Sequence, residues 1–110
     1  MLTTSVLVDT LVLDMDTLAE RLAHVRTLAD VSQREMGRLA GLSESHVGLL
    51  ERGARGEPDL TTIARLARTY DVSFEWLALG HGDAPDAARV QAARDKARAE
   101  RSSKAVGGDD

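Results

Sequence analysis

The polar side chains best suited to recognition lie in one stretch, residues 32–53, which reads SQREMGRLAGLSESHVGLLERG. Gln33 and Ser45 can each donate and accept hydrogen bonds, and the guanidinium group of Arg52 can hold an anion through two N–H groups at once. Glu44 adds a charged acceptor. This is the chemistry of reversible contact, in which a partner is bound and released and no covalent bond changes.

Residue types that build catalytic and metal sites are scarce. The chain has no cysteine, which excludes disulfides, thiolate zinc sites and cysteine nucleophiles. His24 and His81 are too isolated to suggest a metal site, and no Ser/His/Asp set or paired-carboxylate spacing stands out from the helical pattern. We therefore expect a binding protein with neither enzymatic activity nor a cofactor.

Two short helices must position the polar stretch. Ser32-x-x-Glu35 is a capping box that opens the first helix, and Gly41 supplies the left-handed residue that stops it. Ser43 caps the second helix, which ends at Gly53. Two helices joined by so tight a turn cross steeply, and the outer side of the second one protrudes. A helix presented in this way can enter a DNA major groove, which is about 12 Å wide.

Three further helices complete this unit. A second capping box at residues 17–20 opens a helix with one apolar face, Pro58 and Asp59 open another, and Ser73 caps a short fifth. The pattern predicts an all-α, five-helix domain over residues 15–82. The apolar positions expected on its helices are Leu18, Leu22, Val25, Ala29, Met36, Leu39, Ala40, Val47, Leu50, Leu60, Ile63, Leu66, Ala67, Tyr70, Phe74, Trp76 and Leu77.

The two ends of the chain differ from this domain. Residues 1–14 form an apolar extension whose composition favours a strand and whose spacing also allows a helix. It either lies upstream of a start at Met15 or, as a strand, lies on the domain surface or pairs with a second subunit. Residues 83–110 are rich in Ala and Arg, with Val90 as the only large apolar side chain before Val106. They predict a marginal helix over about residues 86–100, followed by a disordered tail.

Charge and hydropathy narrow the possible partners. The 110 residues suffice for one domain with tails, and their net charge is −4. This charge counts against a free-standing DNA binder, because phosphate neutralisation supplies most non-specific DNA affinity. No apolar run reaches the length of a membrane span and no secretory signal is evident, so we expect a cytoplasmic location and no membrane partner.

From roughly Leu18 to Gly82 the sequence resembles the phage-repressor-like, XRE-type helix-turn-helix family. The resemblance extends over LAERLAHVRTLADVSQREMGRLAGLSESHVGLLERG, the segment GEPDLTTIARLARTYDVS and the closing FEWLALG. It implies a five-helix DNA-binding domain that usually acts as a homodimer on a two-fold operator, with the third helix as recognition helix.

The resemblance also implies roles for individual residues. Gln33 matches a position that holds a phosphate or base edge, and Arg26 and Glu51 match a structural ion pair. The candidate DNA contacts are Gln33, Ser43, Glu44, Ser45, His46, Gly48, Leu49, Arg52 and Arg55. Trp76 and Leu79 match the subunit interface, although Trp76 can equally complete the core of the monomer.

Two functions follow as expectations. The first is a dimeric transcriptional repressor that binds double-stranded DNA with the helix over about residues 44–52 in the major groove. The second is a protein-interaction module of the same fold, such as an antitoxin or an adaptor. The acidic charge of the chain, the scarcity of hydrogen-bond donors on this helix and the apolar extension favour the second.

Overall fold

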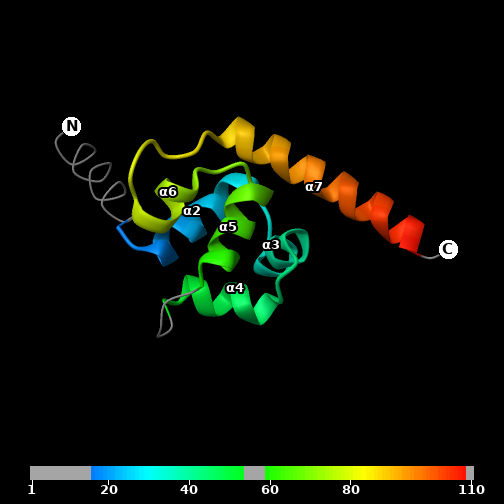
Figure 1. Cartoon of the computed structure of the whole chain (residues 1–110), viewed down its shortest axis with the longest axis horizontal. Helices are drawn as coiled ribbons and strands as arrows, with labels where there is room; N and C mark the ends of the chain where they lie inside the picture. The colour runs from blue at the N-terminus through cyan, green and yellow to red at the C-terminus, as the bar shows by residue number, and fades with distance from the viewer. Residues whose placement is uncertain (1–15, 54–58, 109–110) are drawn as a thin grey trace.

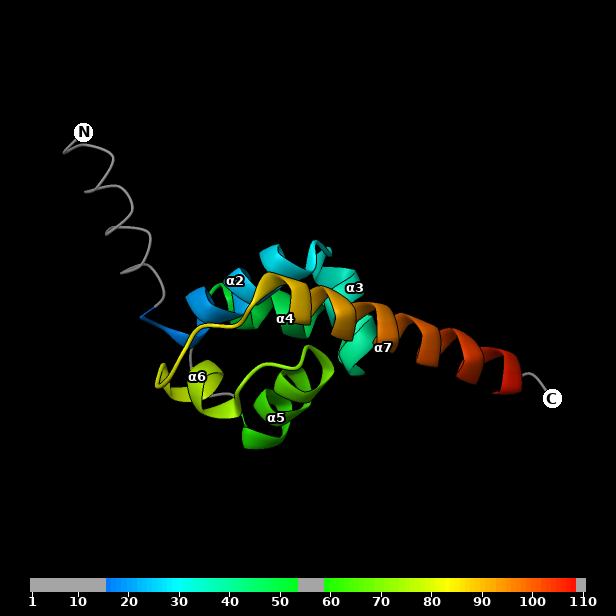
Figure 2. The same cartoon turned by 90° about the horizontal axis from the view of Figure 1, so that it is seen from above.

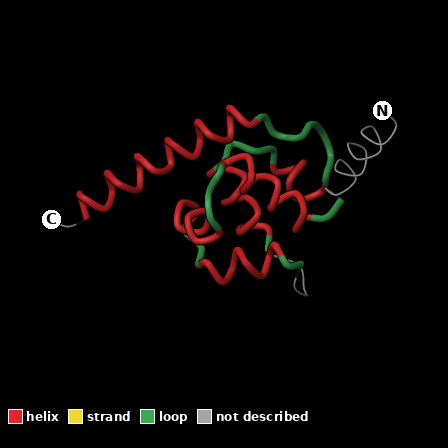
Figure 3. Tube along the Cα trace, turned by 180° about the vertical axis from the view of Figure 1, so that it is seen from behind, coloured by secondary structure: helices red, strands yellow, loops and turns green. Residues whose placement is uncertain are grey.

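Six helices and short loops make up the part of the chain that the computed structural model describes, residues 16–53 and 59–108. They are α2 (Leu18–Ala29), α3 (Gln33–Ala40), α4 (Glu44–Glu51), α5 (Leu60–Thr69), α6 (Phe74–Leu79) and α7 (Ala87–Gly108) (Figure 1). No strand occurs among these residues, as Figure 3 shows. The prediction of an all-α chain with five helices between residues 15 and 82 is confirmed.

Side-chain caps open the helices where the sequence places them. The Thr17 hydroxyl accepts from the backbone N–H of Glu20, whose carboxylate accepts from the N–H of Thr17, so this capping box is complete. Ser32 likewise accepts from the N–H of Glu35. The Glu35 carboxylate does not return to residue 32 but binds Arg38 and Arg98. The prediction of a complete capping box at Ser32 and Glu35 is therefore wrong, because two guanidinium groups outcompete one backbone N–H.

Two glycines make the tight turn between α3 and α4 possible. Gly41 has φ +79°, the left-handed conformation that stops α3. At Gly37, a Cβ would stand 2.7 Å from the carbonyl oxygen of Leu42 and 3.0 Å from that of Ser43. The backbone at the start of α4 therefore lies directly against α3, which fixes the crossing of the two helices.

One apolar core joins all six helices. Tyr70 is fully buried in it, and its hydroxyl donates to the carbonyl oxygen of Met36 at 3.2 Å. Burial raises the pKa of the Tyr70 phenol well above its ordinary value, so this proton stays in place as a donor. Two of the apolar residues expected on the helices lie at the surface instead. The side chain of Leu60 is 68% exposed and that of Phe74 is 40% exposed. The buried apolar side chains include Leu22, Val25, Met36, Leu39, Val47, Ile63, Leu66, Trp76, Leu77 and Val90.

Helix α7 extends further than the sequence predicts and packs on the domain. It continues to Gly108 rather than ending near residue 100, and it contacts α2, α3 and α5 (Figures 1 and 2). Val90 is fully buried. The Gln91 side chain donates to the carbonyl oxygen of Leu28 at 3.1 Å, and Arg94 donates to that of Ala29 at 2.6 Å. These carbonyls have no partner within α2, so α7 satisfies groups that would otherwise need water.

An arginine likewise donates hydrogen bonds to backbone carbonyl groups at the end of α6. The Arg21 side chain is buried on α2 and donates to the carbonyl oxygens of Leu77 and Ala78 at 2.9 and 3.2 Å. Gly80 then turns the chain with φ +78°. Cationic side chains from distant helices therefore neutralise the negative carboxyl ends of both α2 and α6.

Several sequence predictions fall outside the described residues. These are the extension at residues 1–14, the loop at 54–58 that holds Arg55 and Pro58, and the last two residues of the predicted tail. Within the described part, no helix combines the length and the apolar character needed to cross a membrane.

Candidate nucleic-acid interface

The outward side of α4 is the surface that the sequence singled out. Glu44, Ser45 and Leu49 are exposed on it, and Arg52 follows at its end, also exposed. Val47 is fully buried on the opposite side, which holds the helix against the core. Ser43 caps the helix by accepting from the N–H of His46 at 3.1 Å. In Figure 1, α4 lies along one edge of the domain, on the opposite side from α7.

A chain of hydrogen bonds fixes α4 against α2 and α3. Arg26 donates from Nε to Oε2 of Glu51 at 2.7 Å, and Gln33 donates from Nε2 to Oε1 of the same carboxylate at 3.1 Å. The Glu51 side chain is 8% exposed and that of Arg26 is 30% exposed. Arg26 also donates to the carbonyl oxygen of Val31. The Arg26–Glu51 pair forms as the sequence analysis expected, whereas the bond from Gln33 to Glu51 was not foreseen.

Two candidate DNA-contacting side chains lie together beside Gly48. It is buried, and the side-chain atoms nearest to the point where a Cβ would stand are Nη1 of Arg52 at 3.4 Å and Oε1 of Gln33 at 3.5 Å. Gln33 begins α3 and Arg52 follows α4, so only the fold places them side by side. The proximity of Gln33 and Arg52 could not be predicted from the sequence pattern. That pattern groups the outward positions of α4 together and gives no relation between them and Gln33 on α3.

The first turn of α4 has a mixed electrostatic environment. Glu44 is exposed there, and His46 is half-buried near Asp59, the residue that caps α5. A hydrogen bond from the backbone N–H of Thr62 lowers the pKa of the Asp59 carboxyl, and the charge of His46 acts in the same direction. These carboxylates limit the positive potential of the face, so its cationic character depends on Arg52.

The two residues expected at the subunit interface have different environments. Trp76 is 4% exposed, and its ring lies 6.3 Å from that of His24, centroid to centroid. Its side chain thus belongs to the monomer core, which was the alternative interpretation. Leu79 is 58% exposed on the same helix, together with Phe74 at 40%. Any apolar contact made by α6 with another molecule would involve these two side chains.

The profile of the helix-turn-helix family matches residues 22–77, about half of the chain. The matched range extends from α2 to α6 and leaves out α7. No solved structure matches the chain. The described residues hold no cluster of His, Asp and Glu side chains suited to a metal ion. The glycine turn, the capped α3–α4 pair and the exposed face of α4 are the features of this family, and the chain belongs to the XRE-type helix-turn-helix family of DNA-binding transcription regulators.

Proposed function

We propose that the protein is a dimeric repressor that binds a two-fold operator with α4 in the major groove. The observation that carries the proposal is the convergence of Gln33 and Arg52 beside Gly48, at the exposed surface of α4. A guanidinium group and an amide in this position can hold adjacent phosphates and so fix the position of the helix on the duplex. The hydrogen bond that Gln33 donates to Glu51 orders the amide before DNA arrives.

Base recognition falls to three exposed side chains of α4. The hydroxyl of Ser45 can bond to several base edges, and Leu49, which is 46% exposed, can contact a thymine methyl group. Glu44 can accept from a cytosine amino group and repels phosphates, so it mainly disfavours wrong sites. The face lacks a bidentate Arg or Asn, so direct discrimination is modest and DNA shape contributes to specificity.

Selection of bound sequences from a random duplex library at low salt tests this function. The full chain is expected to enrich a motif with two-fold symmetry, and Arg52→Glu is expected to abolish enrichment. Arg68→Glu is the matched control, because it changes the same charge at an exposed position on α5 and should retain the motif. No enriched motif, together with no salt-dependent binding, would contradict the proposal.

Dimerisation is proposed through the exposed apolar side chains of α6. Leu79 is the main candidate, since it is more than half exposed and apolar side chains of this size favour burial. Sedimentation of the wild-type chain is expected to show a dimer, and Leu79→Asp is expected to give a monomer that retains its helical content. A monomeric wild type at the concentrations that bind DNA would rule out the dimeric operator complex.

A further inference from the structure

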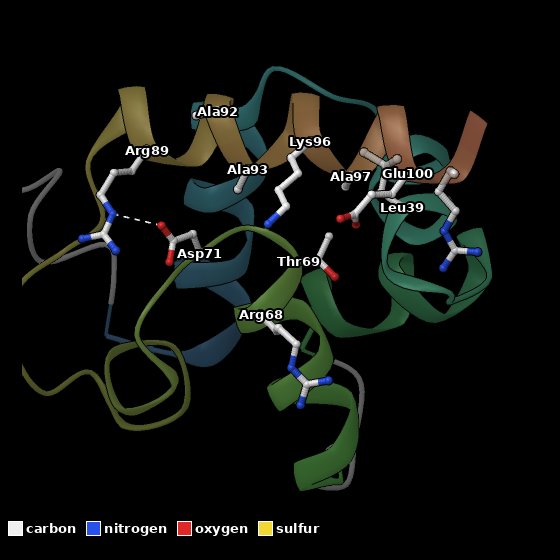
Figure 4. A pocket seen from close by; sticks show the side chains of 11 residues that line it. Leu39, Arg68, Thr69, Asp71, Arg89, Ala92, Ala93, Lys96, Ala97 and Glu100 are labelled. Carbon is white, nitrogen blue, oxygen red and sulfur yellow. Dashed lines mark hydrogen bonds and ion pairs between the residues drawn. The ribbon is translucent and has the colours of Figure 1, made fainter. Parts of the chain in front are cut away.

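A surface pocket lies between α5 and α7, away from the recognition face of α4. Its volume is about 790 Å³, and its walls come from α3, α5 and α7 (Figure 4). Leu39 and the alanines Ala92, Ala93 and Ala97 provide small apolar surfaces along it. Small-molecule sites typically measure roughly 300 to 1,000 Å³. The volume of the pocket and its apolar surfaces suit a ligand with an uncharged part such as a ring system.

Positive charge predominates among the side chains that line the pocket. Arg89 is paired with Asp71 at 3.0 Å, and these two charges offset each other. Lys96 lines the space from α7 and Arg68 lines it from α5, and neither has a partner among the described residues. Figure 4 shows the Lys96 amino group between Asp71 and α5. Two cations from opposite walls are thus available to one ligand.

A second pair of cations meets at one end of the pocket. Nη2 of Arg101 lies 3.2 Å, and Nη1 of Arg65 lies 3.5 Å, from the point that a Cβ on Gly41 would occupy. Arg65 donates weakly to the carbonyl oxygen of Gly41, and no carboxylate pairs with either guanidinium group in the described part of the chain. Like charges this close repel each other, and an anion placed beside them would relieve the repulsion.

We propose that this pocket binds a small, multiply charged anion with an uncharged body, the chemical class to which nucleotides belong. The uncharged body lies against Leu39 and the alanines, and the charged groups bind Lys96, Arg68 and Arg101. The basic side chains in the lining outnumber Asp71 and Glu100, so the pocket retains a net positive charge. Helix α7, which supplies most of the lining, lies outside the range matched by the family profile.

Titration of the isotope-labelled full chain with three probes, followed by NMR, tests this site. ATP carries both the charged phosphates and the uncharged nucleoside. Tripolyphosphate carries the charged phosphates alone, and adenosine carries the uncharged nucleoside alone. ATP is expected to shift the backbone amides of Leu39, Thr69 and Ala93 in a saturable manner. Tripolyphosphate should shift the signals of the same amides with a weaker affinity. Adenosine should leave these signals unchanged.

Charge-removing variants locate the binding. Lys96→Ala and Arg68→Ala are each expected to weaken ATP binding by about tenfold, the effect of losing one charge-assisted hydrogen bond. Lys96→Gln, which keeps most of the side chain, should have the same effect. Arg34→Ala is the matched control, because Arg34 is exposed on α3 outside the pocket and has no partner among the described residues.

Four results would overturn the proposal. They are shifts that do not saturate, an equal loss of affinity in Arg34→Ala, adenosine binding as tightly as ATP, and no response to either phosphate compound. If duplex DNA were the only probe to shift these amide signals, the basic side chains of the pocket would be contacts for DNA phosphates. The small-molecule site would then be refuted as well.

Discussion

Arg26 of α2 donates to the carboxylate of Glu51, the last residue of α4, across 2.7 Å. The other oxygen of that carboxylate accepts from Gln33, the first residue of α3. One buried carboxylate therefore links three helices at the place where the proposed DNA contacts converge. Its loss should affect both the stability of the domain and the orientation of α4.

Arg26→Ala is expected to lower the free energy of unfolding by about 2 kcal/mol, because it leaves the Glu51 carboxylate buried with Gln33 as its remaining side-chain partner. Urea denaturation measures the change. The double variant with Glu51→Ala should lose less stability than the two single variants combined, since the two groups interact directly. Arg34→Ala serves as control and should stay within about 0.5 kcal/mol of the wild type. Strictly additive losses would show that the pair contributes nothing to stability.

Two glycines, Gly37 of α3 and Gly48 of α4, should respond in opposite ways to alanine. Gly37→Ala is expected to cost about 2 kcal/mol, because its Cβ would stand 2.7 Å from a backbone oxygen that cannot easily move. Gly48→Ala meets only the ends of two long side chains, at 3.4 and 3.5 Å. Alanine is the better helix former by about 1 kcal/mol, so thermal unfolding of Gly48→Ala should match or exceed the wild type. Equal effects at both positions would contradict the proximity of α3 and α4.

Val90→Ala tests the docking of α7. The variant should lose about 1 to 2 kcal/mol of stability, because it leaves space at a fully buried position. Alanine has the higher helix propensity, so a loss cannot come from weakening α7 itself. Hydrogen exchange should show faster exchange throughout α7 while α3 and α4 remain protected. An unchanged urea midpoint would mean that α7 is not anchored at Val90.

Glu35 predicts a dependence of stability on pH. The hydrogen bond from Arg98 is the main cause that holds the pKa of this carboxyl below its ordinary value of 4.5, and Arg38 adds to the effect. A carboxyl with a lowered pKa in the folded state stabilises that state above its unfolded pKa and loses this contribution as the pH falls through the folded pKa. The wild type should therefore lose stability below about pH 4.5. Urea denaturation across this range should show a smaller loss in Glu35→Gln and in Arg98→Ala.

The sequence predicted those features of the fold that depend on near neighbours. A cap such as Thr17 or Ser43 needs only the next three residues, and Gly41 stops α3 through its own backbone freedom. The apolar period likewise identified the core residues of α2 to α5, apart from Leu60 at the start of α5. Five helices and their order could be predicted on this basis.

Features that depend on distant segments could not be predicted in the same way. Val90 is a single apolar residue in a charged segment, and nothing local indicates that the core has a place for it. The side chain of Gln33 bonds to a residue that follows it by 18 positions, and its approach to Arg52 requires the crossing angle of α3 and α4. Trp76 was ambiguous because either burial or an interface suits its type, and only the packing of α2 against α6 decides it.

The bonds from α7 to the end of α2 have a consequence for the order of folding. Gln91 and Arg94 follow the carbonyls that they bind by 63 and 65 residues. Closing so long a loop has a large entropic cost, and during synthesis α7 leaves the ribosome after every other helix described. The five preceding helices can therefore assemble first, with the carbonyls of Leu28 and Ala29 hydrated. Docking of α7 on the assembled helices would then displace that water.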